Sequence, residues 1–77
     1  MNYNERYDVI IRKLRGLRAE NDLSLDEVSK KLGVHKSTIS LYEKGKRKLP
    51  LNTFLDLLNL YNTNIITFFQ NIDNSHK

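Results

Sequence analysis

The chain is 77 residues long, which suits one small domain, so we expect residues 1–77 to form a single unit. It contains no cysteine, and its two histidines, His35 and His76, stand far apart, so we expect neither disulfides nor a metal site. The net charge is +4, and the apolar runs fall short of the roughly 20 residues that span a bilayer. The polar, mixed-charge N-terminus does not resemble a signal peptide, so we expect a cytoplasmic protein without a membrane partner.

Residues 4–21 are predicted to form a helix, because apolar side chains recur there three and four positions apart. These residues are Tyr7, Ile10, Leu14 and Leu17. Gly16 interrupts the segment at a cost of up to about 1 kcal/mol relative to alanine. Either close packing or a tolerated imperfection explains that glycine.

The segment 24–32, with the sequence SLDEVSKKL, has the features of a capped helix. Ser24 and Glu27 form the capping-box pattern, and Asp26 adds negative charge at the positive end of the helix dipole. Gly33 then supplies the left-handed residue that ends a helix.

A second short helix is predicted for residues 36–44, ending at Gly45. Only three residues of this region are expected to point inward, namely Val34, Ile39 and Tyr42. A helix that is polar over most of its circumference gains little from burial, so we expect its outer face to carry the function.

The last third of the chain is predicted to form two more helices, over residues 52–61 and about 64–72. No segment alternates with a period of two, so the predicted fold class is all-α with about five helices. The thirteen apolar residues between Leu49 and Ile72 exceed what one core face needs, and monomers rarely expose that much apolar surface. We assign four of them to the core: Leu51, Phe54, Leu58 and Tyr61. We assign five to a homodimer interface: Leu57, Leu60, Ile66, Phe69 and Ile72.

The positive charge is concentrated in one part of the chain. Residues 30–48 hold seven basic side chains and one acidic side chain, whereas residues 1–29 and 49–77 each have a net charge of −1. A solvated basic face is one interpretation, but this concentration favours a binding site for a polyanion.

Two short helices joined by a turn at Gly33 are typical of a helix-turn-helix motif, here about residues 25–44. The run LSLDEVSKKLGVHKSTISLYEKGKRKL, with a leucine-rich helix and NIITFF after it, resembles the Cro/repressor-type helix-turn-helix family, often called Xre-like. The resemblance covers about residues 10–70. It implies a five-helix domain that binds double-stranded DNA, usually as a homodimer on a palindromic operator, with the second motif helix in the major groove. The chain length is also similar to that of restriction–modification controller proteins.

The resemblance assigns base contacts to one face of the second motif helix: Lys36, Ser37, Ser40 and Leu41, with Thr38 beside the DNA backbone. It assigns phosphate contacts to four further residues: Ser24, Lys44, Lys46 and Arg47. Lysine can donate to guanine, serine can pair with several bases, and leucine can touch a thymine methyl group. Phosphate contacts add affinity and salt dependence without sequence information. A solvated loop at 44–48 and a merely exposed Leu41 are the alternatives.

The resemblance also implies a structural ion pair between Arg18 and Glu43, which links the first helix to the third. The sequence departs from the family at three positions. Leu25 stands where many relatives carry a glutamine that binds phosphate, and Ser29 replaces a usual alanine. His35 occupies the place of a serine N-cap, so we expect weaker capping and either a phosphate contact or simply an exposed helix start.

These features predict a sequence-specific transcriptional regulator. The alternative is an antitoxin-like module whose main partner is a toxin protein, with DNA binding for autoregulation. We expect no enzymatic activity, because the sequence offers no nucleophile–base pair, phosphate-binding glycine loop or carboxylate dyad. We likewise expect no cofactor and no small-molecule ligand.

Overall fold

The computed structural model describes the backbone of residues 3–75 and the side chains of residues 6–72, and His76 lies outside this range. The described residues form five helices and no strand: α1 (Tyr3–Glu20), α2 (Leu25–Leu32), α3 (Lys36–Glu43), α4 (Leu51–Leu60) and α5 (Ile65–Ser75). The predicted all-α fold class is therefore confirmed. No helix in the described part of the chain is long and apolar enough to cross a membrane.

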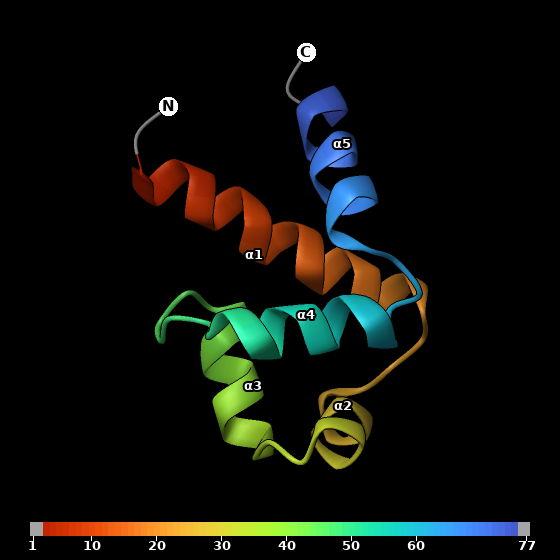
Figure 1. Ribbon diagram of the computed structural model, residues 1–77. Coiled ribbons are helices and arrows are strands. Elements are labelled where there is room, and N and C mark those ends of the chain that lie inside the picture. Colours follow the sequence, from red (N-terminus) through yellow and green to blue (C-terminus); the bar gives the residue numbers. More distant parts are fainter. Residues whose placement is uncertain (1–2, 76–77) are drawn as a thin grey trace.

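The helices are arranged so that the molecule has two distinct ends (Figure 1). The short helices α2 and α3 pack against each other at one end, and α5 lies at the other. The long helix α1 packs against both α3 and α5, while α4 lies between these two ends and packs against α5. This arrangement leaves one side of α3 without a neighbouring helix.

The core draws buried apolar residues from every helix. Its members are Ile11, Leu14, Val28, Ile39, Tyr42, Phe54, Leu57, Leu58, Tyr61, Phe68 and Ile72. The ring of Phe68 meets that of Phe54 edge to face, with centroids 5.3 Å apart, and this contact joins α5 to α4. Ile39 and Tyr42 attach α3 to the same core, so the opposite side of α3 must face outward.

Several apolar residues lie elsewhere than the sequence predicts. In α1 the prediction missed Ile11, which is buried, whereas Ile10 is only partly buried. Leu51 was predicted in the core but is 68% exposed, because it lies in the first turn of α4, beyond the helices that cover Phe54. Leu57 was predicted on the surface but is buried, because it lies one turn after Phe54 on the same face of α4.

Gly16 lies on the exposed surface of α1, away from any tight contact. A Cβ atom at this position would come no closer than 4.0 Å to its nearest neighbour, Oε2 of Glu20. Of the two explanations offered by the sequence, the tolerated imperfection therefore holds.

Candidate nucleic-acid interface

The first motif helix, α2, begins with a reciprocal pair of hydrogen bonds. The Glu27 amide donates to Oγ of Ser24 at 3.1 Å, and the Ser24 amide donates to Oε1 of Glu27 at 3.0 Å. The backbone hydrogen bond from Ser24 is the main cause that lowers the pKa of Glu27, with the Ser24 side chain adding to it. The cap fixes the start of α2, and Ser24 remains exposed, as a phosphate contact requires.

The corner between α2 and α3 is set by one glycine and two buried side chains. Gly33 has a φ of 69°, and its amide donates to the Ser29 carbonyl at 2.9 Å, which ends α2. Val28 of α2 and Ile39 of α3 are both fully buried in the core. The two helices therefore cannot rotate without disrupting the core, and the outward face of α3 is fixed.

The outward face of α3 carries the predicted base-contacting residues. At 100° per residue, Ser37, Ser40 and Leu41 lie on the side of α3 opposite the buried Ile39 and Tyr42, with Lys36 and Thr38 at the two edges of this face. Lys36 and Ser37 are exposed, whereas Thr38, Ser40 and Leu41 are half-buried. The N-terminal turn of α3 therefore presents the most accessible side chains of this face.

His35 caps α3 through a nitrogen of its ring. Its Nδ1 accepts a hydrogen bond from the Ser37 amide at 3.3 Å and lies 2.8 Å from Oγ of Ser37. The cap engages Nδ1 and leaves Nε2, the other ring nitrogen of the exposed His35, for a further contact.

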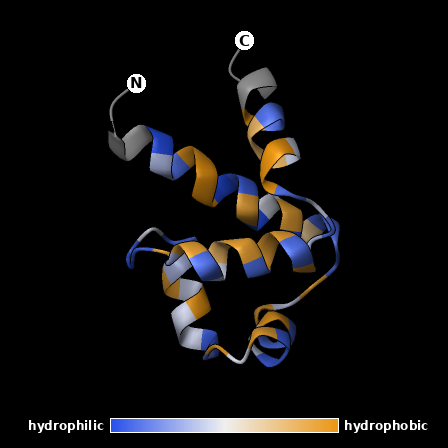
Figure 2. Cartoon of the chain, viewed as in Figure 1, coloured by the Kyte–Doolittle hydropathy of each residue, from blue (hydrophilic) through white to orange (hydrophobic). Residues whose placement is uncertain are grey.

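The basic loop, defined as residues 44–48, leaves the end of α3 through a left-handed glycine. Gly45 has a φ of 70°, and its amide donates to the Tyr42 carbonyl, while the Lys46 amide donates to the Leu41 carbonyl at 2.9 Å. The four cationic side chains of the loop are all exposed: Lys44, Lys46, Arg47 and Lys48. Figure 2 shows this loop as a hydrophilic stretch beside α3, whereas α5 is largely hydrophobic.

Arg18 of α1 and Glu43 of α3, which the family resemblance pairs, form a two-pronged ion pair. Nε donates to Oε2 at 2.7 Å and Nη2 donates to Oε1 at 3.0 Å, while Nη1 of Arg18 donates to the Leu23 carbonyl at 2.9 Å. The hydrogen bond to Glu43 is the main cause that raises the pKa of Arg18. Glu43 is the one acidic residue of segment 30–48, so this pairing leaves the surface around α3 positive.

The residues predicted for a dimer interface separate into two groups. Leu57 and Ile72 are only 4% and 8% exposed, so these two assignments are corrected to the core. Ile72 lies one turn after Phe68 and continues the buried face of α5. Ile66 and Phe69 are exposed, and Leu60 is half-buried. Three exposed apolar residues were not predicted for this surface: Leu51, Leu55 and Ile65.

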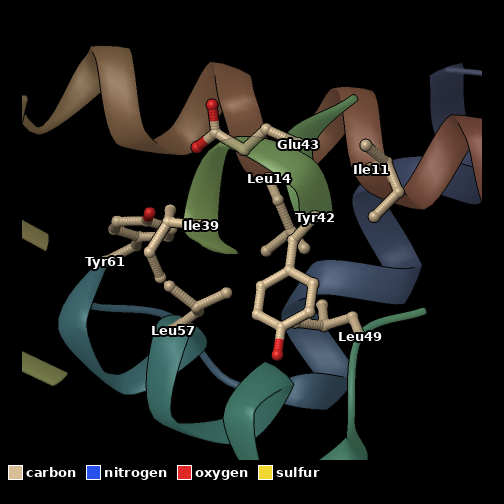
Figure 3. Close-up of a pocket in the computed structure, with 8 residues that line it drawn as sticks. All are labelled: Ile11, Leu14, Ile39, Tyr42, Glu43, Leu49, Leu57 and Tyr61. Atoms are coloured by element: carbon tan, nitrogen blue, oxygen red, sulfur yellow. The ribbon is translucent and has the colours of Figure 1, made fainter. Parts of the chain in front are cut away.

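The largely enclosed cavity in the core is too small for a ligand. It has a volume of about 10 Å³, near the minimum for one water molecule, and eight residues line it, most of them apolar (Figure 3). The described residues also contain no group of three or more histidine, aspartate or glutamate side chains that could hold a metal ion.

A capped first helix, a glycine corner, an outward second helix and a basic loop define the helix-turn-helix class of DNA-binding domain. Residues 11–68 match the helix-turn-helix family model, and the chain belongs to this Xre-like family. The cryptic phage CTXphi transcriptional repressor RstR of Vibrio cholerae is 43% identical over 49 residues, which are 64% of this chain and 44% of that protein. The chain thus spans less than half the length of this relative.

Proposed function

We propose that the protein represses transcription by binding a palindromic operator as a homodimer, with α3 in the major groove. The observation that carries this proposal is the outward face of α3, which is held by the core and by Arg18 and is followed directly by the exposed cations of the basic loop. The similar phage protein is named as a transcriptional repressor, which agrees with this proposal.

Base reading is assigned to the outward face of α3. Lys36, exposed in the first turn, suits the O6 and N7 acceptors of guanine. Ser37 lies in the same first turn, and its hydroxyl can pair with several bases. Ser40 and Leu41 lie further along the same face, where Leu41 suits a thymine methyl group.

Phosphate binding is assigned to the basic loop and to the two helix starts. Lys44, Lys46 and Arg47 are exposed beside the reading helix, and each contact with a phosphate releases counterions. Ser24 stands at the start of α2, and the exposed His35 stands at the start of α3. These groups hold the protein on DNA of any sequence, with Thr38 at the edge of the groove.

Dimerisation is assigned to an apolar surface on α4 and α5, defined by the exposed residues Leu51, Leu55, Ile65, Ile66 and Phe69. The ring of Phe69 lies 6.2 Å from that of the buried Phe54, so Phe69 lies where α5 packs against α4. Covering this surface with a second copy removes exposed apolar area and gives the two-fold symmetry that a palindromic operator mirrors. The same surface on a monomer would favour the alternative, an antitoxin-like module that docks a different protein there.

The proposal is tested by a salt titration and by sedimentation. Two protomers with about three to four phosphate contacts each predict a log–log slope of binding against salt of roughly −5 to −7. Sedimentation at tens of micromolar should give dimers, and Phe69→Glu should give monomers that retain helical circular dichroism. A slope near zero contradicts DNA binding, and a monomeric wild type contradicts the dimer.

A further inference from the structure

The first helix reaches across the molecule to the basic loop through a tyrosine. The Leu49 amide, directly after the loop, donates to the Tyr7 hydroxyl at 2.8 Å, in a partly buried contact between residues 42 positions apart. The aromatic ring of Tyr7 also packs against the core. The family resemblance begins at about residue 10 and does not include this tyrosine.

This hydrogen bond fixes the second end of a loop whose first end is already fixed. At the first end, the Lys46 amide is bonded to the Leu41 carbonyl of α3. At the second end, Pro50 is the N-cap residue of α4, and its carbonyl accepts from the Phe54 amide. The tyrosine contact at Leu49 leaves only residues 47–48 between the two anchored ends.

The tyrosine is one of three α1 side chains that hold this region. Arg15 donates through Nη1 to the Glu43 carbonyl at 3.3 Å, and Arg18 pairs with the Glu43 carboxylate. Residues 7, 15 and 18 are eight and three positions apart, so they lie on one side of the helix, next to the buried Ile11 and Leu14. Helix α1 therefore supports both the end of α3 and the basic loop (Figure 1).

We propose that Tyr7 is a positioning residue for DNA binding, which holds Arg47 and Lys48 in the orientation that meets phosphates. This role rests on the proposed function. A loop that is ordered before DNA arrives loses less conformational entropy on binding, so the same cations bind more tightly. The effect is independent of DNA sequence, because the loop contacts the backbone and not the bases.

The test is Tyr7→Phe, which keeps the ring and removes the oxygen that accepts from Leu49. We expect about threefold to tenfold weaker binding to every DNA sequence, since a hydrogen bond contributes on that order. The salt slope should become shallower by up to about one per protomer, and the sequence selected from a random DNA pool should not change. In an Arg47→Ala/Lys48→Ala background the added loss should disappear, as coupling through the loop requires.

Two controls separate this role from a general loss of folding. Tyr42→Phe removes a hydroxyl that makes no hydrogen bond within the described residues, from the buried side of α3, and should bind DNA like the wild type. In the free protein, exchange of the Leu49 amide should accelerate in Tyr7→Phe while helical circular dichroism stays constant.

The outcomes distinguish this inference from the proposed function. Wild-type protein without salt-dependent DNA binding overturns the proposed function, and the role of Tyr7 falls with it. If the wild type binds DNA and Tyr7→Phe binds with the same affinity and salt slope, only the role of Tyr7 is overturned. The role is also overturned if Tyr7→Phe reduces DNA affinity by the same factor in the Arg47→Ala/Lys48→Ala background, because the tyrosine then does not act through these two cations.

Discussion

Breaking the ion pair between Arg18 and Glu43 should weaken the attachment of α3 to α1 and lower the free energy of unfolding. Glu43→Gln keeps the size of the side chain but leaves the Arg18 guanidinium, whose side chain is only 22% exposed, without its charged partner. Removing one partner of a fully buried pair costs about 3–5 kcal/mol, and an exposed pair contributes at most about 1 kcal/mol. For exposures of 22% and 12% we expect an intermediate loss of about 2 kcal/mol.

This loss is measurable as a change in the free energy of unfolding in urea. For a chain of this length, about 2 kcal/mol corresponds to a fall in Tm of roughly 8–16 °C. The double variant Arg18→Met/Glu43→Leu removes both charges, so it should recover most of the stability. The matched control is Lys30→Gln, which breaks an exposed pair with Asp26 at 3.4 Å and should cost less than about 0.5 kcal/mol.

Binding to DNA gives the second readout of the same variants. Because Glu43 ends α3, its loss should also reduce DNA affinity at temperatures where the protein is still folded. A Glu43→Gln variant no less stable than Lys30→Gln would refute the reasoning. So would a double variant less stable than Glu43→Gln, because the cost would then not arise from an unpaired charge.

Three further changes test the local structure by urea unfolding. Gly16→Ala should raise the free energy of unfolding by about 0.5–1 kcal/mol, because the added methyl group meets no atom within 4 Å other than the Glu20 side chain, and lower stability would contradict this. His35→Ala should cost about 1 kcal/mol through the lost N-cap and His35→Asn much less, whereas equal losses would show that the cap is not the cause. Burial raises the pKa of Tyr61 to about 12, above an unfolded value near 10, so its contribution is complete below about pH 10 and is lost as the pH rises toward 12. Tyr61→Phe should lack that part of the alkaline decline, and parallel curves for the two proteins would contradict the assignment.

Local features of the motif were predictable because they depend on nearby residues. The Ser24 cap and the left-handed Gly33 follow from short sequence patterns, and both are present at their predicted positions. The family resemblance supplied the Arg18–Glu43 pair, which spacing alone does not reveal, since the two residues are 25 positions apart.

Features that depend on tertiary packing were not predictable in the same way. A helical period indicates that one face of α4 is buried, but the width of that face and the point where it ends depend on the neighbouring helices, so Leu51 and Leu57 were each misplaced. The contact between Tyr7 and Leu49 joins distant segments through a hydroxyl, and the apolar pattern treats tyrosine only as a hydrophobic residue. The cap at His35 likewise depends on a ring orientation that a preference table for capping residues does not include.

The central claim is that α3 reads bases while the basic loop holds the backbone. It is tested most directly by selecting binding sites from a random DNA pool with wild type, Lys36→Ala and Lys46→Ala. Lys36→Ala should relax the preference at one base pair per half-site, at a cost of about 1–3 kcal/mol. Lys46→Ala should keep the selected sequence, weaken binding to all sequences alike and make the salt slope shallower by about one per site. A changed preference in Lys46→Ala together with an unchanged one in Lys36→Ala would contradict the account, because α3 would then dock on DNA differently.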